Sequence, residues 1–130
     1  MPVVLNHMIV PAADKGVAAA FFAGLLGVPV SAEAGPFAPV RVNDELTLDF
    51  DERRRAEPGH YAFLVDDGTF DALMERLGRD PAIEYGAGPE EGWNRGINRL
   101  GGGRGSMSGT PTGTATNSSP SCLEVRPRRW

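Results

Sequence analysis

The sequence predicts an α+β fold built from two related modules, each of which begins with a strand and a helix. The order of strand, capped helix and glycine stop occurs over residues 5–27 and again over residues 60–78. The two histidines of the chain, His7 and His60, stand near the start of the two copies. Two copies are too few for a solenoid, so a pair of βαββ-type modules is the economical interpretation.

The first module is predicted from alternation and from helix boundaries. Residues 5–10 read as a short strand that Pro11 closes, with Leu5, His7 and Ile9 on one face and the residues between them on the other. Asp14 is a suitable N-cap for a helix that Gly27 ends in the left-handed conformation. Residues 37–42 and 46–51 then read as two strands of a hairpin.

The second module repeats this order. Residues 60–65 predict a strand, and Asp66 or Asp67 caps a helix whose apolar residues recur at intervals of three and four. We expect Gly78 to end this helix and a short strand to lie near residues 83–85.

Composition and charge exclude some classes of partner. Of 130 residues, 41% are hydrophobic and 23% are charged, which is close to globular averages. The longest apolar run, residues 17–30, falls short of the ~20 residues that a spanning helix needs, so no membrane partner is expected. Residues 1–100 carry 9 basic and 16 acidic side chains, and such a body repels nucleic acid. The arginines at residues 53–55 are flanked by acidic residues, so we expect a solvated loop.

The location is expected to be cytoplasmic. The first residues have no basic region before an apolar stretch and no small-residue cleavage site. Cys122 is the single cysteine and has no partner for an internal disulfide.

The two histidines suggest a metal centre. Neutral imidazole is a common ligand of divalent metals, and two histidines with one carboxylate leave positions open for substrate or oxygen. Asp49 is a candidate carboxylate because it lies on the polar face of the 46–51 strand. The alternative stays open at this point: each histidine could be a hydrogen-bonded structural residue, and Asp49 could belong to an ordinary acidic hairpin.

Four segments of the chain resemble the vicinal-oxygen-chelate superfamily, which includes glyoxalase I, bleomycin-resistance proteins and extradiol dioxygenases. They are residues 5–10, 25–29, 46–50 and 59–65. The resemblance covers residues 3–105 and implies two βαβββ modules, a U-shaped sheet around a cavity and a homodimer. In the enzymes of this superfamily, a divalent metal is held by His, His and Glu.

The resemblance implies site residues as well. It matches His7 and His60 to two metal-ligand positions, and it matches Asp49 more loosely to a further carboxylate of glyoxalase I. The metal would be Zn, Ni, Fe or Mn, acting as a Lewis acid on a small substrate whose adjacent oxygens chelate it. Whether the protein is an enzyme, as a metal-dependent lyase or dioxygenase, stays open. The alternatives are a non-catalytic protein that binds a bleomycin-type drug and an inactive, truncated-like variant.

The chain departs from this superfamily after residue 105. We expect residues 1–105 to form the domain and residues 106–130 to be a low-complexity tail, which leaves the second module incomplete at its C-terminal strands. Reading the codons of residues 105–118 one base earlier permits Val-Tyr-Val-Arg-Asp-Pro-Asp-Gly-His-Gly-Tyr-Glu-Leu, which is the motif that the superfamily has here. We hypothesise that the tail is frameshifted, and Glu124 is then a candidate substitute for the lost carboxylate ligand.

Overall fold

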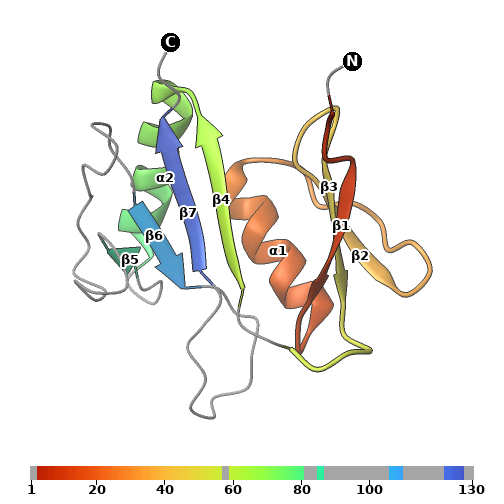
Figure 1. Ribbon diagram of the computed structural model, residues 1–130. Helices are drawn as coiled ribbons and strands as arrows, with labels where there is room; N and C mark the ends of the chain where they lie inside the picture. The colour runs from red at the N-terminus through yellow and green to blue at the C-terminus, as the bar shows by residue number, and fades with distance from the viewer. Residues whose placement is uncertain (1–2, 57–58, 81–84, 87–105, 110–121, 128–130) are drawn as a thin grey trace. The chain divides into compact units, whose positions relative to one another are not determined.

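The computed structural model describes residues 3–56, 59–80, 85–86, 106–109 and 122–127 (Figure 1). These residues divide into two compact units, with residues 3–56 in the first and the remaining described residues in the second. Each unit contains a small β-sheet and one helix, so the predicted α+β class is confirmed.

The first unit has the order βαββ. Its elements are β1 (His7–Pro11), α1 (Lys15–Leu26), β2 (Phe37–Arg41) and β3 (Thr47–Asp51). The strands lie in the order β1-β3-β2, with β1 parallel and β2 antiparallel to β3. The predicted hairpin is therefore confirmed, and β1 occupies an edge of this sheet.

The boundaries of α1 follow the predicted capping residues. The Asp14 carboxylate accepts a hydrogen bond from the Val17 N–H at 3.0 Å, which satisfies one of the free donors at the helix start. Gly27 follows the helix with a φ of 73°, a left-handed conformation that glycine adopts without a steric penalty.

The core of the first unit lies between α1 and one face of the sheet. The Phe22 ring of α1 packs against the Phe50 ring of β3, with centroids 5.1 Å apart, and both side chains are fully buried. Alternation along the strands directs further apolar side chains to this face. The buried ones are Val10, Ala38, Val40 and Leu48.

The second unit has the order βαβββ. Its elements are β4 (His60–Val65), α2 (Asp67–Arg79), β5 (Tyr85–Gly86), β6 (Ser106–Gly109) and β7 (Cys122–Pro127). The strands lie in the order β4-β7-β6-β5, and α2 packs against β7.

The two units share one pairing pattern, as a duplicated module predicts. In each, the first strand lies parallel to the last strand, and the last strand lies antiparallel to the one before it. The described strands β6 and β7 fall within residues 106–130, where composition alone predicts a low-complexity tail. In β7, apolar Leu123 and Val125 alternate with other residues, and the ladder to β4 supplies the backbone hydrogen bonds.

The helix α2 differs slightly from its predicted boundaries. Asp66 is the N-cap, and its carboxylate accepts from the Thr69 N–H at 2.7 Å. Gly78 does not end the helix, which continues to Arg79, and Asp80 follows in extended conformation. The predicted strand at residues 83–85 lies mostly outside the described residues, of which Tyr85 begins β5. Among the described residues, neither helix has the length and hydropathy needed to cross a bilayer.

Candidate functional site

The second unit brings a histidine and a carboxylate together on adjacent strands. The Nε2 atom of His60 on β4 lies 2.7 Å from the Oε2 atom of Glu124 on β7. In the parallel ladder, His60 is opposite Cys122 and Ala62 is opposite Glu124. His60 and Glu124 are thus diagonal neighbours, two residues apart in register on the same face, and the pairing of β4 with β7 is what brings them into contact.

The environment of this pair is asymmetric. The side chain of His60 is 47% exposed, whereas that of Glu124 is 9% exposed. A carboxylate buried to this extent needs polar partners, and the imidazole is one of them. The pair therefore joins a shielded carboxylate oxygen to an imidazole that solvent or a small molecule can reach.

The donor set of this pair fits a divalent metal. An imidazole nitrogen and a carboxylate oxygen that each lie about 2.0–2.2 Å from a tetrahedral ion are roughly 3.4 Å apart. The observed 2.7 Å between Nε2 and Oε2 is a hydrogen-bond length, so the two side chains have to separate by several tenths of an ångström to hold an ion. Within the described residues, no group of three or more His, Cys, Asp or Glu side chains is arranged to hold a metal. The pair could supply two ligands to a metal, which would need at least one more.

His7 lies on β1 in the first unit, on the sheet face opposite α1. The alternation that buries Val10 on the α1 face directs His7 and Ile9 to the other face, and both are exposed. The Nδ1 atom of His7 lies 2.8 Å from the Oδ1 atom of Asn6. This contact uses one ring nitrogen, and none of the described residues bonds to the other, Nε2.

Asp49 shares that open face with His7. It lies on β3 opposite Ile9, while His7 is opposite Thr47 in the same parallel ladder. His7 and Asp49 are therefore diagonal neighbours within one unit, whereas His60 and Glu124 meet in the other. The sequence predicts His7, His60 and Asp49 as ligands and raises Glu124 only as a substitute. The alternation of Leu123 and Val125 around Glu124 is the signal for its strand.

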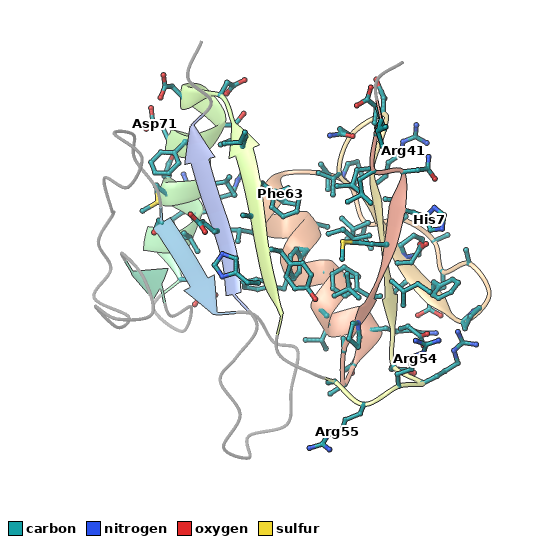
Figure 2. The ribbon with its side chains drawn as sticks, in the orientation of Figure 1. His7, Arg41, Arg54, Arg55, Phe63 and Asp71 are labelled. Atoms are coloured by element: carbon teal, nitrogen blue, oxygen red, sulfur yellow. The ribbon has the colours of Figure 1, made fainter. Side chains whose placement is uncertain are left out.

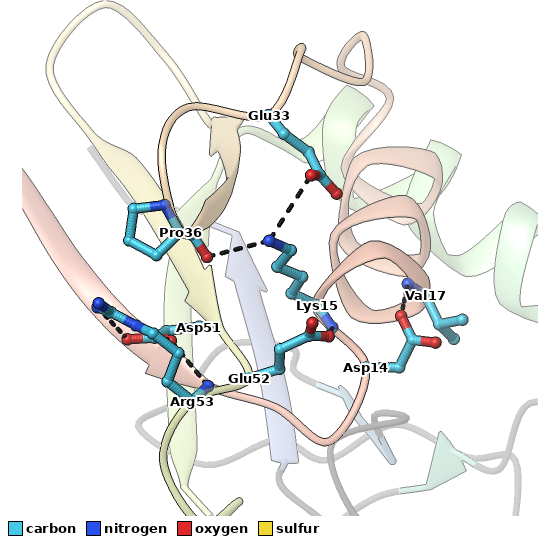
Figure 3. A network of polar contacts seen from close by, with 8 residues as sticks. All are labelled: Asp14, Lys15, Val17, Glu33, Pro36, Asp51, Glu52 and Arg53. Atoms are coloured by element: carbon cyan, nitrogen blue, oxygen red, sulfur yellow. Dashed lines mark hydrogen bonds and ion pairs between the residues drawn. The ribbon is translucent and has the colours of Figure 1, made fainter.

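A second polar site in the first unit is not predicted from the sequence. Asp51, at the end of β3, is fully buried and binds Arg53 through three hydrogen bonds (Figure 3). The Arg53 Nε donates to Oδ1 and Nη2 donates to Oδ2, each at 3.0 Å, and the Arg53 backbone N–H donates to Oδ1 at 2.9 Å. These side-chain and backbone bonds lower the pKa of Asp51 from 3.8 to about 2.

Next to this pair, Lys15 ties the start of α1 to its neighbours (Figure 3). Its Nζ donates to the Pro36 carbonyl at 3.2 Å and lies 3.6 Å from the Glu33 carboxylate. Its backbone N–H donates to Glu52 Oε2 at 3.2 Å. Because Lys15 is engaged in this network, we assign it a structural role.

Comparisons with known proteins point to one superfamily. No protein-family model and no curated protein match the chain. Among solved structures, the chain is 39% identical to "Oxidase ChaP-H2", over 100% of this chain and 97% of that one, with a TM-score of 0.80. It is 36% identical to "Oxidase ChaP-H1", over 98% of both chains, also with a TM-score of 0.80.

More distant structures share the fold. The fosfomycin resistance protein FosX from Mesorhizobium loti is 17% identical, over 99% of this chain and 95% of its own, with a TM-score of 0.66. The lactoylglutathione lyase from Agrobacterium tumefaciens is 17% identical, over 98% and 95% of the two chains, with a TM-score of 0.65. The repeated module with its parallel first and last strands agrees with these likenesses. The chain belongs to the family of the two ChaP oxidases, and it has the vicinal-oxygen-chelate fold.

Proposed function

We propose that the protein binds a divalent metal and a small substrate that chelates this metal through two adjacent oxygens, and that it oxidises this substrate. The sequence leaves lyase and dioxygenase chemistry open. Two relatives above 35% identity carry the word oxidase in their names, which favours oxidation by dioxygen over lyase chemistry. Fe or Mn is then preferred to Zn, because dioxygen chemistry needs a metal that changes its oxidation state.

The contact between His60 and Glu124 carries this proposal. The two donor atoms are 2.7 Å apart, and the side chains come from the two strands that the fold brings side by side. We assign His60 and Glu124 of the second unit as two ligands, and we retain His7 and Asp49, which the sequence predicts, as candidates for the others. When bound, the metal would act as a Lewis acid and polarise the chelating oxygens.

Nε2 of His60 and Oε2 of Glu124 share one hydrogen bond, so a bound cation has to replace this contact. The half-exposed imidazole faces the ligand, while the shielded carboxylate stays in place.

The first experiment measures metal in the full-length protein. The purified protein is reconstituted with Fe(II) without oxygen and desalted, and its iron is counted by elemental analysis. We expect about one ion per chain, and a loss of at least about tenfold in affinity in both His60→Ala and Glu124→Gln. Oxygen uptake with a catechol probe is then measured on the same samples.

A matched control separates ligand loss from a general effect of charge. Glu75→Gln removes an exposed carboxylate on α2 that pairs with Arg79 and lies outside the proposed centre. It should retain the iron of the unmodified protein. Full iron content in either ligand variant, or no bound iron in the unmodified protein, would refute the metal centre. Bound probe with no metal requirement would support the drug-binding alternative instead.

We also propose that the protein is a homodimer, which the resemblance implies, and that it is located in the cytoplasm. Light scattering coupled to gel filtration tests the dimer directly. A monomeric mass over a range of protein concentrations would contradict it.

A further inference from the structure

We propose that Arg53 is an anion anchor on the open face of the β1-β3-β2 sheet, and that it binds an acidic group at the far end of a ligand whose other end lies at His7. The role given to His7 rests on the proposed function. The role given to Arg53 stands on the geometry of the first unit alone.

The guanidinium of Arg53 is held in place before any ligand arrives. One edge of the group is bound to the Asp51 carboxylate by two parallel hydrogen bonds of 3.0 Å. Its Cζ atom also lies 5.5 Å from the centroid of the Phe37 ring. Phe37 is directly opposite Asp51 in the β2-β3 ladder, so both contacts lie on the face away from α1. A guanidinium fixed in this way loses little further entropy when it binds an anion.

The end of the guanidinium formed by Nη1 and Nη2 has N–H groups that Asp51 does not use. A guanidinium carries five N–H groups, and Asp51 takes one from Nε and one from Nη2. Within the part of the chain that the structure describes, Nη1 has no acceptor, and the side chain of Arg53 is 59% exposed. A carboxylate can therefore approach Nη1 and Nη2 and form a second bidentate pair.

The charges around Arg53 are balanced. The acidic neighbours in sequence are already engaged, since Asp51 binds Arg53 and Glu52 accepts from the Lys15 N–H. Arg54 and Arg55 are exposed and lie on the same loop, beyond the end of β3 (Figure 2). Residues 49–55 carry three positive and three negative charges, so a preference for an anion here has to come from Arg53 itself and not from the local field.

The sheet face between His7 and Arg53 indicates the chemistry of the middle part of the ligand. From His7 opposite Thr47 to Pro11 opposite Asp51 there are four strand steps, a distance of about 13 Å. The face between them exposes 42% of Ile9 and carries the partly buried side chains of Pro39 and Phe37, with Thr47 and Asp49 of β3 beside them. The ligand class is thus an elongated molecule with an apolar middle part, chelating oxygens at one end and a carboxylate or similar anion at the other.

The experiment uses the full-length protein, freed of metal by a chelator, and two probes that differ only in charge. Biphenyl-4-carboxylate carries the anion, and biphenyl-4-carboxamide is its neutral equivalent. We expect calorimetry to show that the carboxylate binds at least about tenfold more tightly, as a charged hydrogen-bonded pair implies. Arg53→Gln should abolish this preference, whereas Arg55→Gln, on the same loop, should retain it.

A second variant guards against misfolding. Arg53→Gln leaves the buried Asp51 carboxylate without its main partner, so the double variant Asp51→Asn with Arg53→Gln removes both charges together. It should fold, as judged by circular dichroism, and show no preference for the carboxylate. Equal binding of the two probes by the unmodified protein, or a preference that survives in the double variant, would overturn the anchor. An equal loss in Arg55→Gln would overturn it too, because diffuse charge would then account for the preference.

The proposed function is tested separately with iron present. A probe that adds two adjacent hydroxyls to the far ring, 3′,4′-dihydroxybiphenyl-4-carboxylate, should bind more tightly to the iron-loaded protein than to the metal-free one. A carboxylate preference without any effect of iron would refute the metal centre and leave the anchor standing. Tighter binding with iron but no preference for the carboxylate would refute the Arg53 anchor and support the metal centre.

Discussion

The Nε2 atom of His60 lies 2.7 Å from Oε2 of Glu124, although 64 residues separate the two in the chain. The contact exists because β4 and β7 pair in parallel with Ala62 opposite Glu124. Neither side chain identifies a site by itself. Their contact places a shielded carboxylate oxygen beside an imidazole that is 47% exposed.

The first prediction concerns the ligands beyond this pair. If His7 is a ligand, as the sequence predicts, His7→Ala should lower the affinity for Fe(II) as strongly as His60→Ala does, by at least about tenfold. The two carboxylates are compared directly: Glu124→Gln should lose iron, and Asp49→Asn should retain it. Elemental analysis and iron titration check this outcome. Retention of iron by Glu124→Gln together with its loss from Asp49→Asn would exchange the two roles.

The second prediction concerns acid stability. The pKa of Asp51 is lowered from 3.8 to about 2, mainly by the side-chain hydrogen bonds from Arg53. A carboxyl with a lower pKa in the folded state stabilises the fold above the unfolded pKa, and this contribution is lost as the pH falls through the folded pKa. The free energy of unfolding should therefore drop between about pH 4 and pH 2.

Urea titrations at a series of pH values measure this drop, and Asp51→Asn should flatten the curve in that range. Asp66 also has a lowered pKa, because the Thr69 backbone N–H binds its carboxylate at the start of α2. A smaller dependence on pH should therefore persist in Asp51→Asn. An unchanged curve in this variant would show that the ion pair with Arg53 does not set the acid limit.

The third prediction concerns the core of the first unit. Phe50 is fully buried and packs on Phe22, so Phe50→Ala leaves a cavity and should destabilise the protein by about 3–5 kcal/mol. Val30, which is 67% exposed, provides the control: Val30→Ala should change stability by about 0.5 kcal/mol or less. Denaturant unfolding checks both values. A similar, small effect for the two variants would mean that the Phe22–Phe50 packing contributes little.

The fourth prediction concerns the gene. If the tail is frameshifted, the third base of the Thr116 codon is G, so that it forms GAA with the first two bases of the Asn117 codon. Sequencing the coding DNA decides this, and any other base there rules the hypothesis out. A chain with the restored frame would carry its glutamate ligand at this point, seven or eight residues before Glu124. Comparison of its iron affinity with that of the present chain would show how well Glu124 substitutes.

Much of the fold follows from local patterns. Asp14 and Gly27 bound α1 as their capping chemistry predicts, and Asp66 caps α2 in the same way. These features involve hydrogen bonds over a few residues, so a short window of sequence contains them. The repeated order of strand and helix likewise indicates two related modules.

Local patterns are less informative for residues 106–130. Composition predicts a low-complexity segment there, whereas the structure has β6 and β7 in the second unit. Cross-strand pairing decides whether such a segment forms a strand, because the ladder to β4 supplies partners that the segment lacks by itself.

By itself, the sequence determined the helices, most of the strands, the duplicated order and the two histidines as candidate ligands. Only the tertiary structure decided that Glu124 contacts His60 and that Asp51 is buried against Arg53, which orients a guanidinium on the open sheet face. The physical reason is the sequence separation over which each interaction acts. Capping and periodicity act between residues a few positions apart, whereas strand register and burial depend on which distant segments pair, and a linear pattern does not specify that choice.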